Sequence, residues 1–208
     1  MTLAKLILGV LLLLPRHSTD QAESEAAWRA RMLVAADAVN EATARATCAG
    51  IEGCRPVWRG SRRTLAAAVL AIGKHESGYA GYVGTGHCDE GPKGMRCDNG
   101  QARTYWQTWK VACPAAWSAE PGSDAEIRAG AQCAARLLAG AYLFCAKPDL
   151  TEDQRWQRAF GRYAGQGCEW RGGTERVATL HQVLDQFGKI RPEQVEPTIT
   201  LVSELSRD

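Results

Sequence analysis

The stretch Leu65–Gly78, which reads LAAAVLAIGKHESG, decides how the rest of the chain is interpreted. Leu65, Val69 and Ile72 recur at the i, i+4, i+7 spacing that is typical of the buried stripe of an amphipathic helix. The next position on this stripe is Glu76, so the helix carries a carboxyl group on the face that otherwise points into the core. Gly78 is a typical helix stop, which places this carboxyl group in the last turn, at the edge of a cleft.

A carboxyl group against apolar walls resists ionisation, because burial penalises its charged form. A general acid that works near neutral pH needs such a group. The stretch therefore predicts Glu76 as a catalytic proton donor. Two other interpretations stay open: a surface glutamate, or a buried glutamate paired with Lys74 or His75.

Length and charge set the broad class of the protein. The chain has 208 residues, which favours one domain with a single core. Its formal net charge is +2 and it contains no dense basic run, so composition does not indicate nucleic-acid binding. A modest arginine cluster before the Glu76 helix is either a solvated face or a contact for an anionic polymer; its members are Arg55, Arg59, Arg62 and Arg63.

An apolar run at the N-terminus, residues 6–14, reads LILGVLLLL and follows Lys5. It has the length of the core of an export signal and is too short to span a bilayer. We expect residues 1–23 to be an export signal or an uncleaved N-terminal anchor. We therefore expect an exported protein, periplasmic or extracellular, with no stable membrane span in its mature form.

The cysteines agree with export. All eight follow the apolar run, and neither a C-x-x-C pair nor the spacing of a metal site is present. Disulfides in an oxidising compartment are therefore favoured over metal binding. Short loops favour Cys48 with Cys54 and Cys88 with Cys97; for the remaining four, the hypothesis is Cys113 with Cys133 and Cys145 with Cys168.

Helical periodicity marks most of the chain, which predicts an all-α domain over residues 24–190 and a polar tail over 191–208. Residues 79–102 break the pattern: they are rich in glycine, and a Cys88–Cys97 bridge would pin them as a long functional loop. The acids of this loop, Asp89, Glu90 and Asp98, lack the twelve-residue calcium pattern. The predicted helices are 24–47, 65–76, 104–113 ended by Pro114, 123–145 and 151–163 with capping boxes, and one from Thr174 through Phe187.

Three segments fall in an order that resembles the soluble lytic transglycosylases and goose-type lysozymes of the lysozyme-like superfamily. They are Glu76-Ser77-Gly78, then residues 100–107 (GQARTYWQ), then residues 160–167 (FGRYAGQG). In that family an E-S pair at a helix end is followed by G-x-x-G-L-[WM]-Q and then by A-Y-N-A-G. The resemblance covers roughly residues 65–167.

The resemblance implies a lysozyme-like helical fold and an enzyme that cuts the MurNAc–GlcNAc bond of peptidoglycan. Glu76 matches the catalytic acid, Ser77 the serine beside it, Gln107 a glutamine that contacts the substrate, and Tyr163 a tyrosine that orients the acid or the sugar. Tyr105 is a further candidate for substrate binding, because flat side chains suit the apolar faces of sugars. The chain departs from the family where Thr104-Tyr105 replaces Gly-Leu and where Ala164 replaces Asn.

The chemistry leaves three functions open. A lytic transglycosylase needs one acid, because the acetamido group and the 6-hydroxyl of the substrate complete the reaction. A hydrolytic lysozyme or chitinase needs a second carboxylate, for which Asp89, Glu90 and Asp98 are candidates. The third is a non-catalytic wall-binding module, which an acid on a buried stripe disfavours. We expect a monomer that acts on peptidoglycan glycan strands and needs no cofactor or metal.

Overall fold

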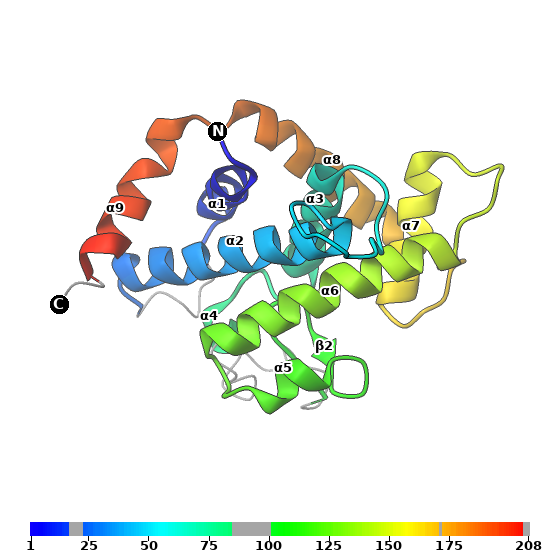
Figure 1. Cartoon of the computed structure of the whole chain (residues 1–208), viewed down its shortest axis with the longest axis horizontal. Helices are drawn as coiled ribbons and strands as arrows, with labels where there is room; N and C mark the ends of the chain where they lie inside the picture. Colours follow the sequence, from blue (N-terminus) through cyan, green and yellow to red (C-terminus); the bar gives the residue numbers. More distant parts are fainter. Residues whose placement is uncertain (17–22, 85–100, 171, 206–208) are drawn as a thin grey trace.

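The structure is a computed structural model that describes residues 1–16, 23–84, 101–170 and 172–205. Within these ranges the chain is mostly helical, and its one sheet there is a two-stranded antiparallel hairpin (Figure 1). The elements are α1 (Leu3–Leu13), α2 (Glu25–Thr47), α3 (Arg62–Glu76), α4 (Gly81–Gly84), β1 (Ala102–Arg103), β2 (Thr108–Trp109), α5 (Pro114–Ser118), α6 (Asp124–Phe144), α7 (Glu152–Tyr163), α8 (Gly173–Lys189), a 3-10 helix at Pro192–Gln194 and α9 (Glu196–Leu205).

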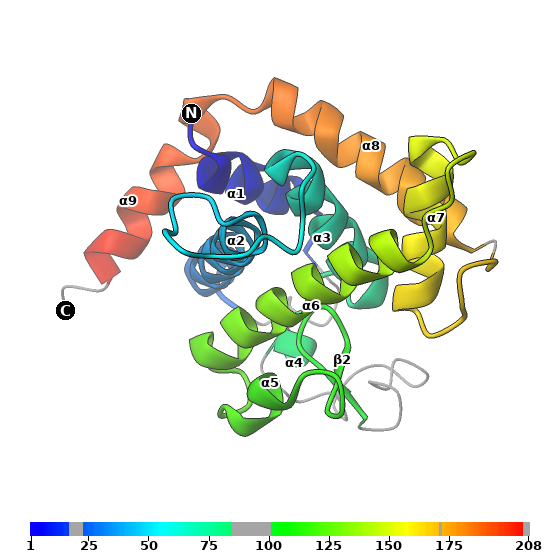
Figure 2. The same ribbon diagram turned by 45° about the vertical axis from the view of Figure 1, so that its right-hand side comes forward.

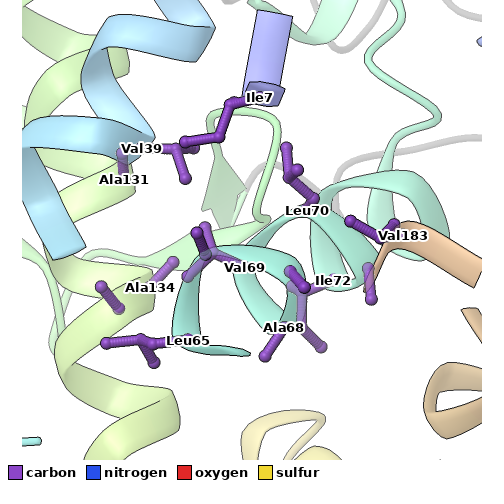
Figure 3. Close-up of a cluster of buried hydrophobic side chains, with 14 of the residues drawn as sticks. Ile7, Val39, Leu65, Ala68, Val69, Leu70, Ile72, Ala131, Ala134 and Val183 are labelled. Carbon is purple, nitrogen blue, oxygen red and sulfur yellow. The ribbon is translucent and has the colours of Figure 1, made fainter. Parts of the chain in front are cut away.

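Helix α3 lies at the centre of the packing. It contacts α2, α6 and α8, and every residue from Leu65 to Gly73 is buried. Figure 3 shows its side chains meeting others from α2, α6, α8 and α1; the labelled partners are Val39, Ala131, Ala134, Val183 and Ile7. The prediction of a buried apolar stripe is confirmed, and the small alanines between the stripe residues let neighbours approach on other faces as well.

The end of α3 follows the prediction. Ser61 caps its start, Glu76 is its last residue, and Gly78 adopts a positive φ of 60°. The N–H of Gly78 donates to the carbonyl oxygens of Gly73 and Lys74, each at 3.1 Å. A glycine in the left-handed region closes the helix without the steric cost that a Cβ would add.

The hairpin corrects one prediction, because the helix expected over 104–113 is absent. Ala102 pairs with Trp109, and Arg103 pairs with Thr108. In the turn, Thr104 and Gln107 both adopt positive φ angles, of 67° and 49°. A right-handed helix cannot contain such residues, so the local sequence pattern gives way to tertiary packing.

The packing that overrides the helix pattern involves two aromatic residues of the turn. Tyr105 and Trp106 are completely buried, and the indole Nε1 of Trp106 donates to the carbonyl oxygen of Val69 at 3.1 Å. Trp106 thereby attaches the hairpin to α3, and Tyr105 attaches it to Arg31 of α2. The hydrophobic free energy of two buried aromatic side chains exceeds the small helix preference of a ten-residue segment.

Three smaller predictions also change. Pro114 does not end a helix but begins α5, where its missing N–H costs nothing. Helix α8 begins one residue before Thr174, with Gly172 as its N-cap. The segment after Pro192, predicted as a polar tail, forms α9 as far as Leu205. Its sequence has no helical periodicity, but burial of Val195 and Thr198 stabilises the helix.

The two predicted capping boxes have different outcomes. At α7 the box of Thr151 and Gln154 is complete in both directions. At α6 the Ser123 hydroxyl accepts from the Glu126 N–H as predicted, at 3.2 Å. The Glu126 carboxylate instead reaches the N–H of Gly122, at 2.6 Å, one residue before the cap.

The N-terminal apolar run forms α1, and α1 is part of the core. It packs against α2, α3 and α8 (Figures 1 and 2). Four of its side chains are at most 1 % exposed, namely Ile7, Leu8, Val10 and Leu11. No helix among the described residues is long and apolar enough to cross a membrane. An export role for residues 1–23 stays a prediction, but the same segment now has a structural role.

Three of the four expected disulfides are confirmed. They join Cys48 to Cys54, Cys113 to Cys133 and Cys145 to Cys168, with Cα–Cα distances of 5.5 to 5.8 Å. The fourth expected pair, Cys88 and Cys97, lies outside the described residues, as does most of the glycine-rich loop. The three bridges fit the oxidising compartment that the sequence predicts.

Loss of the Cys145–Cys168 bridge should be costly, because it closes a long loop between the end of α6 and the chain after α7. The two cysteines are 23 residues apart, so replacing both with serine is expected to lower the free energy of unfolding by about 3 kcal/mol. We expect the Tm to fall by roughly 6–12 °C. The control is the same double change at Cys48 and Cys54, which are 6 residues apart and should cost about 1 kcal/mol less. Circular dichroism melts without reductant measure both, and an unchanged Tm for the first pair would contradict the expectation.

Glu126 is a buried carboxyl group whose Oε1 has no hydrogen-bond partner among the described residues. Its side chain is 1 % exposed, and its nearest cation, Nη1 of Arg103, is 3.7 Å from Oε1. Burial raises the pKa of Glu126, and the Gly122 N–H and Arg103 oppose this shift. The pKa of Glu126 is therefore higher in the folded state than in the unfolded state. As a result, the free energy of unfolding falls as pH rises from the unfolded-state pKa through the folded-state pKa.

Glu126→Gln is therefore expected to remove a pH-dependent loss of stability. The variant should match the wild type in acid, where Glu126 is protonated, and should melt at a higher temperature than the wild type at neutral pH. Thermal melts of both proteins across this range provide the measurement. A Tm difference that stays constant with pH would show that Glu126 does not titrate as described.

Candidate functional site

The predicted acid, Glu76, is half-buried at the end of α3. Its side chain is 21 % exposed, and Oε1 accepts a hydrogen bond from Nη2 of Arg176 at 2.7 Å. This corrects the predicted environment: an arginine of α8 holds the carboxylate, rather than apolar walls, Lys74 or His75. The reason is tertiary, because α8 lies along α3 and brings Arg176 to a group 100 residues earlier in the chain.

Arg176 is itself fixed in place. Its side chain is 14 % exposed, and its guanidinium carbon lies 5.2 Å from the centroid of the Trp170 ring, within the range of a cation–π interaction. Gly172 lets this ring lie flat against the chain, because a Cβ there would be 2.2 Å from the Cζ2 atom of Trp170. The guanidinium is thus held between an indole ring and the Glu76 carboxylate.

A second polar contact joins α3 to α8 beside this ion pair. Nε2 of His75 lies 2.9 Å from Oγ1 of Thr179. Burial lowers the pKa of His75, and the positive charges of Arg176 and Lys74 lower it further. His75 is therefore neutral at neutral pH and acts as a structural link between α3 and α8.

Tyr163, the last residue of α7, brings the third predicted segment to the site. Its hydroxyl group donates to the carbonyl oxygen of Trp106 at 2.7 Å. Burial raises the pKa of Tyr163, and the negative charge of Glu76 raises it further. The ring is therefore neutral, and its hydroxyl lies within electrostatic range of the Glu76 carboxylate.

The other predicted site residues differ in their positions. Gln107 is half-buried in the hairpin turn, directly after the carbonyl group that Tyr163 binds, and its Nε2 donates to the oxygen of Thr104 at 3.3 Å. Ser77 follows Glu76, and its hydroxyl donates to Gly73 O at 3.1 Å and accepts from the Tyr79 N–H at 3.0 Å. These bonds are those of a helix C-cap, and a substrate contact for Ser77 stays a prediction.

Tyr105 is the site residue whose placement contradicts the prediction. It is completely buried, and its hydroxyl accepts from Nη1 of Arg31 at 2.8 Å. A ring with no exposed surface offers nothing to a sugar, so Tyr105 is a core residue. The local sequence could not separate the two roles, because a core and a sugar-binding face both favour aromatic side chains.

Tyr79 belongs to an aromatic cluster with Tyr105 and Trp106. Its ring centroid lies 5.2 Å from that of Tyr105 and 6.2 Å from that of Trp106. It adopts a positive φ of 58° and folds back onto α3, where a Cβ at Gly73 would be 2.4 Å from its Cζ atom. Its hydroxyl oxygen is buried without a hydrogen-bond partner among the described residues, and burial raises its pKa. Tyr79 is 2 % exposed and is a core residue that packs between α3 and the hairpin.

Sequence reasoning missed Arg176 and Trp170. Neither is part of a periodic pattern or a recognisable motif, and they become important only because α8 packs on α3. Within the described ranges, no group of three or more His, Cys, Asp or Glu side chains could hold a metal ion. The three loop acids considered for a second carboxylate, Asp89, Glu90 and Asp98, lie outside the described residues.

Comparisons with known proteins add no assignment. The chain matches no family model, no curated protein and no solved structure. Any function must therefore be argued from the residues of this chain. Those residues are an acid paired with an arginine at a helix end, a neutral tyrosine within its field and a glutamine in the adjacent turn.

Proposed function

We propose that the protein is an exported peptidoglycan-cleaving enzyme, a lytic transglycosylase that cuts the MurNAc–GlcNAc bond with Glu76 as its one acid and base. The observation that supports the proposal is the convergence of three distant segments. The end of α3 carries Glu76, the hairpin turn carries Gln107, and the end of α7 carries Tyr163, whose hydroxyl binds the Trp106 carbonyl at 2.7 Å. Groups with separate roles in one reaction need such a common location.

The reaction needs only groups that this chain and a glycan supply. Protonated Glu76 gives its proton to the glycosidic oxygen as the bond from that oxygen to the anomeric carbon breaks. The acetamido group of the sugar stabilises the positive charge that develops at the anomeric carbon. The 6-hydroxyl oxygen of the same sugar then bonds to that carbon, and its proton returns to Glu76. No water is consumed, and the product is a 1,6-anhydro end.

The neighbours of Glu76 suit this cycle in one respect. The Tyr163 hydroxyl is neutral and within the field of Glu76, so it adds no negative charge when the acid ionises during proton transfer. Its single O–H is donated to the Trp106 carbonyl oxygen at 2.7 Å, which fixes the phenol in place.

Two other functions are alternatives to the transglycosylase. A hydrolytic lysozyme or chitinase would use a second carboxylate and a water molecule on the far face of the sugar. A non-catalytic wall-binding module is favoured by one observation, the ion pair of Glu76 with Arg176 at 2.7 Å, because a structural acid is typically paired in this way.

Incubation with purified cell-wall sacculi separates these functions. Soluble fragments with anhydro ends are the result expected for a transglycosylase. Soluble fragments with reducing ends would indicate a hydrolase. Co-sedimentation of the protein with intact sacculi, without release of fragments, would indicate a binding module and contradict the proposed enzyme.

A further inference from the structure

We propose that Arg176 is the specificity-determining residue of this site: it binds a carboxylate carried by the glycan, and this exchange of partners releases Glu76 to take up the proton that it donates. The inference rests on the proposed function and extends it. It gives the enzyme a reason to prefer an anionic glycan over a neutral one. It also assigns a role to the ion pair, which the reaction itself does not use.

The starting point is the mismatch between the ion pair and acid catalysis. Oε1 of Glu76 is occupied by the hydrogen bond that it accepts from Nη2 of Arg176 at 2.7 Å, whereas a general acid has to present its own proton to the glycosidic oxygen. The ion pair therefore has to open before this oxygen can take part in the reaction. Arg176 has to find another anion before Glu76 can act.

The geometry suits such an exchange. Both side chains of the pair reach solvent, with exposed fractions of 14 % for Arg176 and 21 % for Glu76. The Nε atom of Arg176 is buried and has no hydrogen-bond partner among the described residues, so this donor is unused in the ion pair and becomes available only when the guanidinium shifts toward a new anion. The Trp170 ring supports the guanidinium at 5.2 Å and would still support it after a change of anion. A guanidinium binds a carboxylate through two parallel N–H bonds, which a single bond to Oε1 of Glu76 does not match.

The ligand class follows from this chemistry. The incoming group is a carboxylate attached to the sugar beside the scissile bond, such as one on the lactyl side chain of a muramic acid unit. It can be the free lactyl carboxylate itself or a carboxylate of a peptide attached there. Polymers of N-acetylglucosamine carry no such group and should leave the Glu76–Arg176 pair intact.

A binding experiment tests the inference without relying on turnover. Calorimetry on the full chain carrying Glu76→Gln, in which Arg176 has lost its charged partner, should show at least about tenfold tighter binding of an anionic muramic-acid oligosaccharide than of chitotetraose. The double variant with Glu76→Gln and Arg176→Met should bind the two ligands equally. Three muramic-acid oligosaccharides identify the source of the carboxylate that Arg176 binds. One carries a free lactyl carboxylate, one a stem peptide and one a fully amidated peptide. Equal affinities of the single variant for anionic and neutral glycans would overturn the inference.

An activity experiment provides the second test. The ratio of kcat/KM for the anionic substrate to that for the neutral substrate should be high in the wild type and fall toward one in Arg176→Met, with a gain on the neutral substrate. A structural role would lower both values together and leave the ratio unchanged, which would count against the inference. Arg176→Lys keeps the charge but loses the two parallel N–H donors of the guanidinium, so it should give an intermediate ratio. This variant also covers the case in which the methionine variant does not fold.

A matched control is present on α7. Arg158 donates to Glu169 at 2.7 Å and its side chain is 16 % exposed, so it is an arginine of similar burial and pairing distance, although its acid is 73 % exposed. Arg158→Met should leave the substrate ratio unchanged. If the wild type cleaves no glycan at all, the proposed function fails, while the calorimetric preference of Arg176 for a carboxylate is still measured separately.

Discussion

Glu76→Gln is expected to lower turnover on peptidoglycan by about 10³-fold, within the range that a general acid contributes. Glutamine has nearly the same shape as glutamate, but its amide cannot donate the proton that the glycosidic oxygen needs. The side-chain oxygen can still accept the hydrogen bond that Arg176 now gives to Oε1 at 2.7 Å, so the fold should be kept. We expect a loss of only about 1 kcal/mol in the free energy of unfolding.

The measurement is the rate of muropeptide release from sacculi, with a thermal melt of the same preparation. Glu169→Gln is the control, because Glu169 is also paired with an arginine at 2.7 Å but belongs to no predicted site. That variant should retain the wild-type rate. A Glu76→Gln protein that releases muropeptides at the wild-type rate would reject the assignment of the acid.

Removal of residues 1–16 is expected to leave the domain unfolded. Ile7, Leu8, Val10 and Leu11 are at most 1 % exposed, and each buried side chain of this kind contributes about 1.5–3 kcal/mol. Their sum is comparable to the whole stability of a typical domain, about 5–15 kcal/mol. Circular dichroism of the shortened chain should therefore lack a cooperative melt. A shortened chain that melts like the full one would show that α1 is dispensable.

A single substitution tests the same point with less disturbance. Leu8→Ala is expected to lower the free energy of unfolding by about 2–5 kcal/mol, because it leaves a cavity in the core. Leu13→Ala is the matched control, since Leu13 lies on the same helix but is 52 % exposed, and its change should stay within about 0.5 kcal/mol. Chemical denaturation measures both variants. Equal losses in the free energy of unfolding for Leu8→Ala and Leu13→Ala would contradict the placement of α1 in the core.

The position of α1 also bears on the predicted export signal. A cleaved signal would take away a helix on which the core depends, and it would expose apolar side chains such as Val39 of α2 and Ile190 after α8, whose own burial depends on this packing. We therefore expect the folded protein to retain α1, as an uncleaved N-terminal segment would. Intact-mass measurement of the folded protein purified from expressing cells checks this directly.

Features that depend on local spacing could be predicted from the sequence. The α3 helix, its stop at Gly78 and the capping box of Thr151 and Gln154 each involve residues a few positions apart. Cys113–Cys133 and Cys145–Cys168 span 20 and 23 residues and were only a hypothesis from the sequence, whereas Cys48–Cys54, 6 residues apart, follows from a short loop. In these cases the sequence contains the whole physical cause, namely a hydrophobic stripe, a left-handed glycine or a short loop.

Features that depend on distant contacts could not be predicted. The 102–109 hairpin forms because Trp106 is buried against α3 and Tyr105 against Arg31 of α2, and this burial is invisible in the local sequence pattern. Arg176 reaches Glu76 from 100 residues away, so the Glu76 carboxylate forms an ion pair where the sequence predicts apolar surroundings. The position of Glu76 at the end of α3 could thus be predicted, while its electrostatic environment required the packing of α8 on α3.

The central claim is that one protonated carboxyl group cleaves a glycan without the use of water. Digestion of sacculi by the wild-type protein in ¹⁸O-labelled water, followed by mass spectrometry of the released fragments, tests it most directly. The account predicts 1,6-anhydro ends that carry no ¹⁸O. Fragments with ¹⁸O-labelled reducing ends, or the absence of any released fragment, would contradict it.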